Sequence, residues 1–317
     1  MTTPAASLIV PTHRGAGRLP ALLEALAAQA PGTEDFEVVV VVDGDEDGSA
    51  DLLQRAAESS GLALRAIVLP ENRGRVAALN TGFEAARGDV LVRCDDDLLP
   101  DPEFVARHLA AHADGVERGV VGLYRNRFEP TPYASAYGEP ADERFRADAY
   151  AATADLCWRY WAGNCSLPRS LWQRVGSYDP SYRLYGWEDV DYGYRIAQAG
   201  AAVVLDPELE TVHRAAAVTT RIRARRAAQA AAARRIFEAK HGTGALPPAI
   251  PPRSPWNAAV RAVSLGTGVL GPRHTGGAVD RMLPLVPRGV GRRLVGLAVE
   301  GAALAGYRHP ERAKEVF

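Results

Sequence analysis

Three consecutive carboxylates, Asp95, Asp96 and Asp97, stand directly after a short run of β-branched residues. Adjacent acids repel one another and add nothing to a hydrophobic core, so this arrangement indicates a site for a cation. Carboxylate oxygens suit hard divalent ions such as Mg²⁺ or Mn²⁺, which one or two acids hold and substrate phosphates complete. In an extended chain Asp95 and Asp97 point to the same side. A solvated acidic turn before a helix is the open alternative.

A second acidic group, Glu188, Asp189 and Asp191, lies at the start of a predicted helix. The helix dipole favours carboxylates at this end, and that alone would explain them. In the functional interpretation one of these acids is a general base. The neighbouring Tyr185 and Trp187 would then exclude water from it and hold its pKa within reach of neutral pH.

Three histidines are possible metal ligands by residue type. His213, at a predicted strand end, is structural unless it completes a metal site with Asp97, and an imidazole there would favour Mn²⁺ over Mg²⁺. His108 and His112 are four residues apart on a predicted helix, but no adjacent third ligand accompanies them as in an HExxH motif. We therefore predict that His108 and His112 are surface residues.

The first hundred residues alternate strand and helix signals. Strands are predicted over residues 6–12, 36–44, 64–70 and 89–94, and helices over residues 17–29, 49–60 and 75–87. This order predicts an α/β fold with a doubly wound sheet flanked by helices. Ligands of such sheets lie beyond the carboxyl ends of the strands. The segments at those ends, "PTHRG", "DGDEDG", "PENRGR" and "DDDLLPD", are all polar.

The chain changes character after these repeats. Four of its five tryptophans lie between Trp158 and Trp187, where the rings could stack on sugars or form the core of a subdomain. Residues 214–240 predict one long Ala/Arg helix, followed by the Pro-rich linker 242–255 and weakly amphipathic helices. We expect a catalytic domain over residues 1–213 and a basic, mainly helical region over residues 214–317.

Charge is divided along the 317-residue chain. Residues 1–213 carry 19 Lys/Arg against 33 Asp/Glu, whereas residues 214–317 carry 18 against 5. The basic region could contact anionic lipid head groups, or its first helix could simply pack on the acidic domain. No pattern in the sequence indicates a nucleic-acid partner.

Several classes of protein are disfavoured. The three cysteines form no CxxC pair, which favours a reducing compartment over a disulfide framework. Neither a signal peptide nor a transmembrane segment is apparent, so we expect a cytoplasmic protein, which could also lie peripherally on the inner face of the membrane. The sequence contains no GxxxxGK[ST] and no GxSxG, so a P-loop NTPase and an α/β-hydrolase are not expected.

Four stretches between Ser7 and His213 resemble, in order, the family 2 glycosyltransferases of GT-A fold. They are "SLIVPTHRGAGRLPALLEAL", "VVVVVDGDEDGS", "ENRGRVAALNTGFEAARGDVLVRCDDD" and "WAGNCSLPRSLWQRVGSYDPSYRLYGWEDVDYGYRIAQAG". The resemblance implies a GT-A type mixed sheet with helices on both sides, followed here by a helical C-terminal extension.

The resemblance also implies which residues bind the nucleotide. Pro11, Thr12 and Arg14 would line its pocket, and Asp43 would accept a hydrogen bond from the base. Gly44 stands where a second acid often follows, and Leu79 replaces a frequent arginine. Neutralisation of the pyrophosphate would then fall to Arg73 or Arg75.

The remaining implied roles concern the sugar, the metal and catalysis. Asp95 and Asp96 would contact ribose and sugar, and the metal, Mn²⁺ or Mg²⁺, would be held by Asp97 and His213, with Asp95 beside it. Asp189 would be the catalytic base and Glu188 would support it or bind the acceptor. Four residues would shape the donor-sugar or acceptor pocket: Gly163, Asn164, Ser166 and Trp187.

The expected reaction is therefore metal-dependent and inverting. A sugar would move from a nucleoside-diphosphate sugar to an acceptor hydroxyl on a glycan, a lipid-linked compound or a small molecule. Among the possible donors we expect a UDP-sugar first. One alternative is a sugar-phosphate nucleotidyltransferase, which normally presents a Gly-rich loop bearing lysine, and "VPTHRGAGRLP" contains none. The other is a non-catalytic nucleotide-sugar-binding scaffold, against which the intact Asp95, Asp97, Asp189 and His213 argue.

Overall fold

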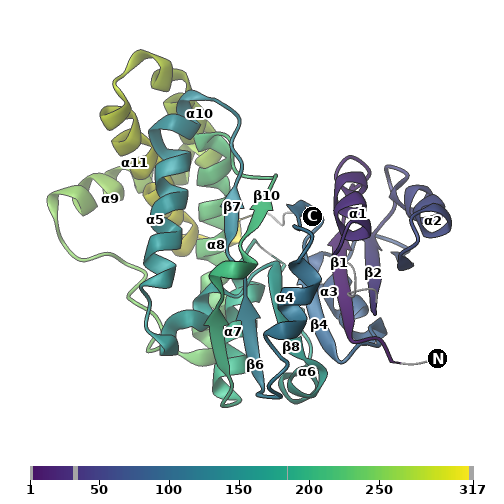
Figure 1. Ribbon diagram of the computed structural model, residues 1–317. Helices are drawn as coiled ribbons and strands as arrows, with labels where there is room; N and C mark the ends of the chain where they lie inside the picture. Colours follow the sequence, from purple (N-terminus) through teal and green to yellow (C-terminus); the bar gives the residue numbers. More distant parts are fainter. Residues whose placement is uncertain (1–2, 31–34, 184, 314–317) are drawn as a thin grey trace.

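The computed structural model describes residues 3–30, 35–183 and 185–313. The first two residues and the last four, which end the predicted C-terminal region, lie outside the described residues. Figure 1 shows strands β1 and β2 on the right and helices α9, α10 and α11 together at the upper left.

The predicted mixed α/β sheet is confirmed. Its order is β3-β2-β1-β4-β8-β6-β9. Strands β1 to β4 alternate with helices along the chain as predicted, and they run parallel. Strand β8 is antiparallel to both β4 and β6. The strands of this sheet are β1 (Ala6–Thr12), β2 (Phe36–Asp43), β3 (Ala63–Leu69), β4 (Val90–Cys94), β6 (Arg118–Val121), β8 (Asn164–Pro168) and β9 (Ala202–Leu205).

Both faces of the sheet are covered, which explains the continuous apolar runs of β1 and β2. Leu8 packs in the same cluster as α1 (Leu19–Ala27), whereas the next residue, Ile9, packs in the cluster that contains Leu79 of α3 (Arg75–Ala85). Successive strand residues point to opposite faces, so α1 and α3 lie on opposite sides of the sheet. Helix α2 (Ser49–Ser59) follows β2.

A small second sheet brings distant segments together. It has the order β5-β10-β7, with β5 (Leu98–Leu99), β10 (Thr211–His213) and β7 (Tyr124–Asn126). In its register His213 lies opposite Leu98 and Asn126. This pairing places His213 beside the end of the acidic triplet.

The remaining helices follow β4 in the chain and include the C-terminal region. Before β10 these are α4 (Phe104–Ala110), the π-helix η1 (Ala134–Gly138), α5 (Glu139–Tyr150), η2 (Ala154–Tyr160), α6 (Arg169–Val175), α7 (Trp187–Gln198) and η3 (Pro207–Leu209). After it come α8 (Thr220–His241), α9 (Pro255–Leu270), α10 (Pro272–Met282), η4 (Leu283–Leu285), α11 (Arg288–Arg308) and η5 (Pro310–Arg312). None of the described helices is both long and apolar enough to cross a bilayer.

The long basic helix starts later than predicted. It begins at Thr220 rather than at residue 214, because the Thr219 hydroxyl accepts a hydrogen bond from the Ile222 backbone N–H and caps it. Arg214 instead continues from β10, where its backbone N–H donates to the Asp97 carbonyl over 2.9 Å. The domain boundary at residue 213 stays a prediction.

Helix α8 packs on the acidic domain at its C-terminal end. Lys240 Nζ lies 2.6 Å from Asp191 Oδ1 and 2.6 Å from Asp179 Oδ2, and His241 Nε2 lies 2.8 Å from Asp191 Oδ1. The Phe237 ring is fully buried. The basic helix was expected either to contact lipid head groups or to pack on the acidic domain. At its C-terminal end it packs on the domain.

The aromatic cluster is mainly core. Tyr178 and Tyr192 stack with ring centroids 4.1 Å apart, and the Trp161 indole donates to the Tyr178 hydroxyl over 2.9 Å. All three rings are almost completely buried, as is Trp158. They belong to one hydrophobic cluster with residues of the sheet and of helix α7. We therefore assign them no role in stacking on sugars.

The prediction that His108 and His112 lie on the surface is wrong. His108 is completely buried and its ring nitrogens lie 2.9 Å from Ser166 Oγ and 3.0 Å from Asn164 Oδ1. His112 Nε2 also contacts Ser166 Oγ, at 2.8 Å. Burial lowers the pKa of His108 to about 3 and that of His112 to about 4. Polar groups on β8 thus accommodate two neutral imidazoles that helical spacing alone could not place.

These histidines should make stability depend on pH. Between their lowered pKa values and the ordinary value of 6.5, the unfolded chain binds more protons than the folded one, so the free energy of unfolding falls as pH falls. Each group contributes a slope of about 1.4 kcal/mol per pH unit in that range. We predict that His108→Gln unfolds with a shallower dependence between pH 6.5 and 4.5, measured by urea denaturation. The matched control is the exposed His274→Gln, and a slope equal to that of the wild type would contradict the assignment.

Candidate active site

A cavity of about 120 Å³ lies at the carboxyl ends of β1, β2 and β4. Its lining consists of Pro11, Thr12, His13, Arg18, Asp43, Arg75, Ala78, Asp95, Asp96 and Asp97. Seven of these residues were predicted as site residues, whereas His13, Arg18 and Ala78 were not. Arg14 does not line the cavity. It is exposed, has a φ of 51° and pairs with Glu46.

The three adjacent aspartates contact different partners. Asp96 accepts hydrogen bonds from the Thr12 hydroxyl at 2.5 Å and from Arg18 Nη2 at 2.8 Å. Asp97 Oδ2 lies 3.1 Å from His213 Nε2. Asp95 accepts from Arg93 Nε at 2.8 Å. Mutual repulsion of the triplet is therefore relieved by distributing its charges among separate partners.

Arg93 joins Asp95, which lines the first cavity, to the acidic pair on α7. Its guanidinium is completely buried, pairs with Asp95 through Nε and with Asp189 Oδ1 through Nη1. It also lies 5.9 Å from the centre of the Tyr178 ring. A buried charge needs such partners, because removal from water is expensive. Arg93 therefore fixes Asp95 and Asp189, which are 94 positions apart, within one ion cluster.

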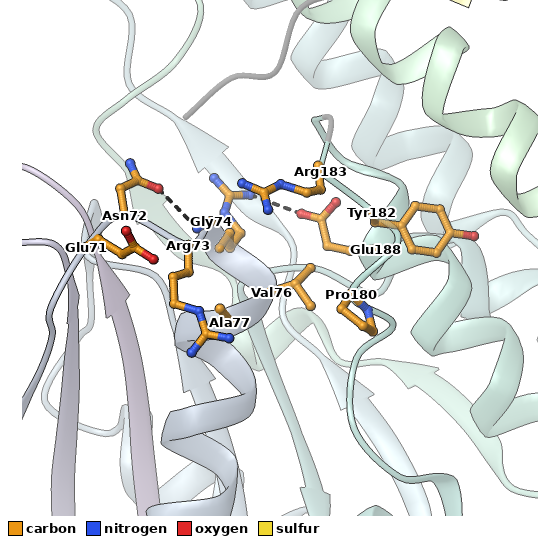
Figure 2. A pocket seen from close by; sticks show the side chains of 11 residues that line it. Glu71, Asn72, Arg73, Gly74, Val76, Ala77, Pro180, Tyr182, Arg183 and Glu188 are labelled. Atoms are coloured by element: carbon orange, nitrogen blue, oxygen red, sulfur yellow. Dashed lines mark hydrogen bonds and ion pairs between the residues drawn. The ribbon is translucent and has the colours of Figure 1, made fainter.

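A second cavity, of about 320 Å³, lies on the other side of Arg75. Figure 2 shows Asn72 and Arg73 entering it from one side and Arg183 and Glu188 from the other. Arg75 Nη1 lies 3.5 Å from Glu188 Oε1, and Arg75 lines both cavities. The two cavities thus meet at this guanidinium.

The charges of the cluster shift the pKa values of its acids in different directions. Burial and the neighbouring Asp189 charge raise the pKa of Glu188 to about 7. Burial also raises the pKa of Asp189, although Arg93 opposes the shift. For Asp95 the attraction of Arg93 and Arg75 outweighs burial, so its pKa is lowered. Asp95 is thus a fixed anion, whereas the pair on α7 lies closer to proton exchange at neutral pH.

Asp97 and His213 fit a divalent metal as a pair of ligands. Asp97 Oδ1 is buried and has no hydrogen-bond partner, which leaves it available to a cation. His213 Nδ1 contacts Asn126 Oδ1 at 2.6 Å and its ring stacks on Tyr124 at 4.7 Å, so the imidazole orientation is fixed. Among the described residues no group of three or more His, Cys, Asp or Glu could hold a metal, so the pair would need further ligands from a substrate.

The predicted pocket residues in β8 and directly before it differ in what they contact. A Cβ on Gly163 would collide with the Asp95 carboxylate and the Tyr124 hydroxyl, and its carbonyl accepts the Asp95 backbone N–H at 2.9 Å. Only glycine therefore fits there. Asn164 and Ser166 are completely buried and contact His108 rather than either cavity. Asn164 acts on the site through β10, since its Nδ2 donates to Thr211 Oγ1 at 3.0 Å.

Two other predicted residues have structural contacts that limit their roles. Both Asp43 oxygens accept backbone N–H groups, from Arg73 at 2.7 Å and from Gly74 at 2.8 Å, and so hold the loop before α3. Trp187 packs against Phe237 with ring centroids 5.4 Å apart and does not line either cavity. The roles expected for them in base and ligand binding stay predictions.

The sequence profile named Glycosyl transferase family 2 matches residues 7–170, which is more than half of the chain. The chain belongs to this family. The matched stretch contains the acidic triplet, Arg93 and the residues that line the cavity at the ends of β1, β2 and β4. Membership in a family of glycosyl transferases disfavours the nucleotidyltransferase alternative.

Relatives of this family 2 chain include proteins named as undecaprenyl-phosphate sugar transferases. It is 41% identical over 183 residues to the undecaprenyl-phosphate 4-deoxy-4-formamido-L-arabinose transferase of Pseudomonas aeruginosa (strain LESB58), covering 56% of this chain and 46% of that protein. The transferase of the same name from Pseudomonas savastanoi pv. phaseolicola (strain 1448A / Race 6) is 38% identical over 189 residues, covering 58% and 48%. The chain spans about half the length of these relatives.

Solved structures confirm the GT-A fold. Mannosyltransferase PcManGT from Pyrobaculum calidifontis, in complex with GDP-Man and Mn²⁺, superposes with a TM-score of 0.65 at 23% identity, covering 96% of this chain and 88% of that one. S. aureus TarS 1-349 in complex with UDP gives 0.54 at 13% identity, covering 98% and 93%. GalNAc-T7 with UDP, GalNAc and Mn²⁺ gives 0.54 at 16% identity, covering 71% and 47%.

Sequence reasoning missed the arginines that organise the site. Arg93 interrupts the apolar strand "DVLVRC", and a charge in a buried strand is a signal that it has a specific partner. Arg18 offered no comparable signal, because its partner Asp96 is 78 positions away.

Removal of Arg93 alone should destabilise the fold. Arg93→Met would leave Asp95 and Asp189 buried without their shared cation, at a loss of about 3–5 kcal/mol in the free energy of unfolding. Arg93→Lys should lose less, since it keeps the charge, although one ammonium cannot reproduce both contacts. Urea denaturation measures this against Arg87→Met, which removes an exposed arginine. Equal stability of Arg93→Met and Arg87→Met would refute the ion cluster.

Proposed function

We propose that this chain is a metal-dependent, inverting glycosyltransferase that moves a sugar from a nucleoside-diphosphate sugar to an acceptor hydroxyl. The observation that carries the proposal is the Arg93 bridge between Asp95 in the donor cavity and Asp189 on α7. It joins the predicted donor ligand and the predicted base in one cluster of fixed geometry.

The nucleotide occupies the smaller cavity in this proposal. Arg18 and Arg75 supply positive charge on its walls, and Pro11, Thr12 and Asp43 lie at its strand ends. A UDP-sugar is the proposed donor. The solved structures of the same fold contain UDP or GDP-Man, which supports the donor class without choosing the base or the sugar.

Asp97 and His213 would hold the metal, and the imidazole favours Mn²⁺. A divalent ion bound there supplies positive charge to the departing diphosphate. His213 is kept in register by β10, and the Asn126 contact fixes which ring nitrogen faces Asp97. The fold neighbours PcManGT and GalNAc-T7 were solved with Mn²⁺.

Asp189 would accept the proton of the acceptor hydroxyl. The acceptor oxygen bonds to the anomeric carbon as the bond to the diphosphate breaks, and the hydroxyl proton passes to Asp189. Attack opposite the leaving group inverts the anomeric centre. Arg93 holds Asp189 in place, and Glu188, paired with Arg75, lines the second cavity, which would receive the acceptor.

A lipid phosphate is a second candidate acceptor. The relatives are named as undecaprenyl-phosphate transferases, and Arg73, Arg75 and Arg183 line the second cavity. A phosphate monoester has a second pKa near 6 and is already ionised at neutral pH, so it needs no general base. The raised pKa values of Glu188 and Asp189 favour the hydroxyl acceptor, whose proton must be removed.

We predict that Asp189→Asn lowers turnover by at least about 100-fold, since general-base catalysis typically contributes 10²–10⁴-fold. Nucleoside-diphosphate release from UDP-sugars with Mn²⁺ would be measured with two acceptors, a hydroxyl-bearing glycolipid and a polyprenyl phosphate. The exposed Asp51→Asn is the matched control, and donor affinity should stay unchanged. Full turnover of Asp189→Asn with the polyprenyl phosphate would indicate that the acceptor is a phosphate rather than a hydroxyl. Turnover of neither acceptor by the wild type would revive the non-catalytic alternative.

We also predict that Asp97→Ala removes the metal-dependent part of donor binding, because Asp97 Oδ1 is a buried oxygen at the site with no hydrogen-bond partner among the described residues. Isothermal titration of UDP with and without Mn²⁺ tests this directly. His213→Ala should behave alike, whereas the exposed Asp51→Ala should keep the Mn²⁺ effect. Equal Mn²⁺ dependence in Asp97→Ala and the wild type would exclude Asp97 as a ligand.

The cytoplasmic location expected from the sequence remains a prediction. All three cysteines, Cys94, Cys157 and Cys165, are buried and free, which is compatible with a reducing compartment.

A further inference from the structure

The most exposed large apolar side chains of the described residues all lie in one C-terminal stretch. Val269, Leu285, Leu265 and Leu270 are 85%, 83%, 69% and 62% exposed, and the next, Val116, is 54% exposed. Isolated exposed apolar residues are ordinary, but four of this degree within residues 265–285 indicate a surface with a partner.

The C-terminal half of helix α9 (residues 262–270) is inverted relative to a helix that faces water. Its exposed residues follow helical spacing and are Ala262, Leu265, Gly266, Val269 and Leu270. The opposite face buries polar Ser264 and Thr267, and residues 262–270 contain no charge. A helix on the surface of a water-soluble domain normally buries the apolar face and exposes the polar one.

A basic cavity of about 660 Å³ adjoins this apolar face, since Leu270 lines it. Its lining includes five basic side chains and no Asp or Glu: Arg225, Arg273, His274, His309 and Arg312. Within the described parts of the chain, neither Arg225 nor Arg273 has an acidic partner. Burial and the neighbouring Arg273 and Arg226 lower the pKa of Arg225, so these arginines repel one another.

We propose that these residues form a docking face, Leu265, Val269 and Leu270 with Arg225 and Arg273, that binds the surface of an anionic lipid bilayer. The leucines and valine would enter the boundary of the acyl layer, and the arginines would meet lipid phosphates. The described helices are too short or too polar to span a bilayer, so the contact is peripheral.

A second copy of the chain fits this face less well. A two-fold contact places the same patch on both subunits, so Arg225 and Arg273 would face their own counterparts without acids to neutralise them. The whole region 214–317 has 18 Lys/Arg against 5 Asp/Glu, which adds to that repulsion. An anionic bilayer supplies the missing negative charge.

Helix α8 connects the docking face to the candidate active site. Arg225 lies in its first turns, and Lys240 at its other end pairs with Asp191 of α7. The two residues are fifteen positions apart, which corresponds to a rise of about 22 Å along the helix axis. Docking would therefore hold the acceptor side of the site at a fixed distance from the lipid surface. The inference goes beyond the proposed reaction, because bilayer binding needs neither donor nor acceptor.

Vesicle flotation of the full chain tests the proposal, with phosphatidylcholine vesicles compared against phosphatidylcholine–phosphatidylglycerol vesicles. We expect binding to the anionic vesicles only, and loss of most of it between about 0.1 M and about 1 M salt. Arg225→Gln/Arg273→Gln should weaken binding at least about tenfold, since each basic residue near the surface contributes about fivefold. Val269→Asp should also abolish it, whereas the same change at exposed Val116 should not.

Three results would overturn the proposal. These are equal binding to both vesicle types, normal binding of Val269→Asp, and self-association in light scattering that Val269→Asp removes while no vesicle binds. The last result would assign the face to a second copy of the chain. Circular dichroism verifies that each variant is folded. Nucleoside-diphosphate release with a water-soluble acceptor should be the same in Val269→Asp and the wild type, so failure of docking and failure of the proposed reaction are separable.

Discussion

A guanidinium buried in the central sheet is the constraint on which the candidate site depends. Arg93 has no exposed surface, and its charge is stabilised by the carboxylates of Asp95 and Asp189, which both accept from it. Asp95 belongs to the end of β4, whereas Asp189 belongs to the first turn of α7. Burial of Arg93 with both of its partners therefore also brings the end of β4 and the start of α7 together.

The sequence predicted well those features that depend on local patterns. Strands β1 to β4 and their helices follow from apolar runs and helical spacing, and parallel strands place their carboxyl-end loops at one edge. For the same reason Asp43 and the acidic triplet line one cavity. The Asp97–His213 contact was also anticipated, because the resemblance to the family assigned both residues to one site.

The features that were missed depend on contacts between distant segments. The neutral pair His108 and His112 is buried only because β8 offers Asn164 and Ser166, more than 50 positions away. Local sequence shows two histidines at helical spacing and cannot show what covers them. The start of α8 was misplaced for a related reason, since pairing with β5 and β7 ends β10 at His213 and a Thr219 cap then opens the helix.

The division of charge along the chain now has two physical explanations rather than one. At the C-terminal end of α8, Lys240 and His241 neutralise buried Asp191 and so help fix the helix that carries Glu188 and Asp189. At the other end Arg225 has no acidic partner among the described residues, and the neighbouring Arg273 and Arg226 repel it. In the proposed docking, this end of α8, next to the exposed apolar face of α9, meets the negative charge of a bilayer.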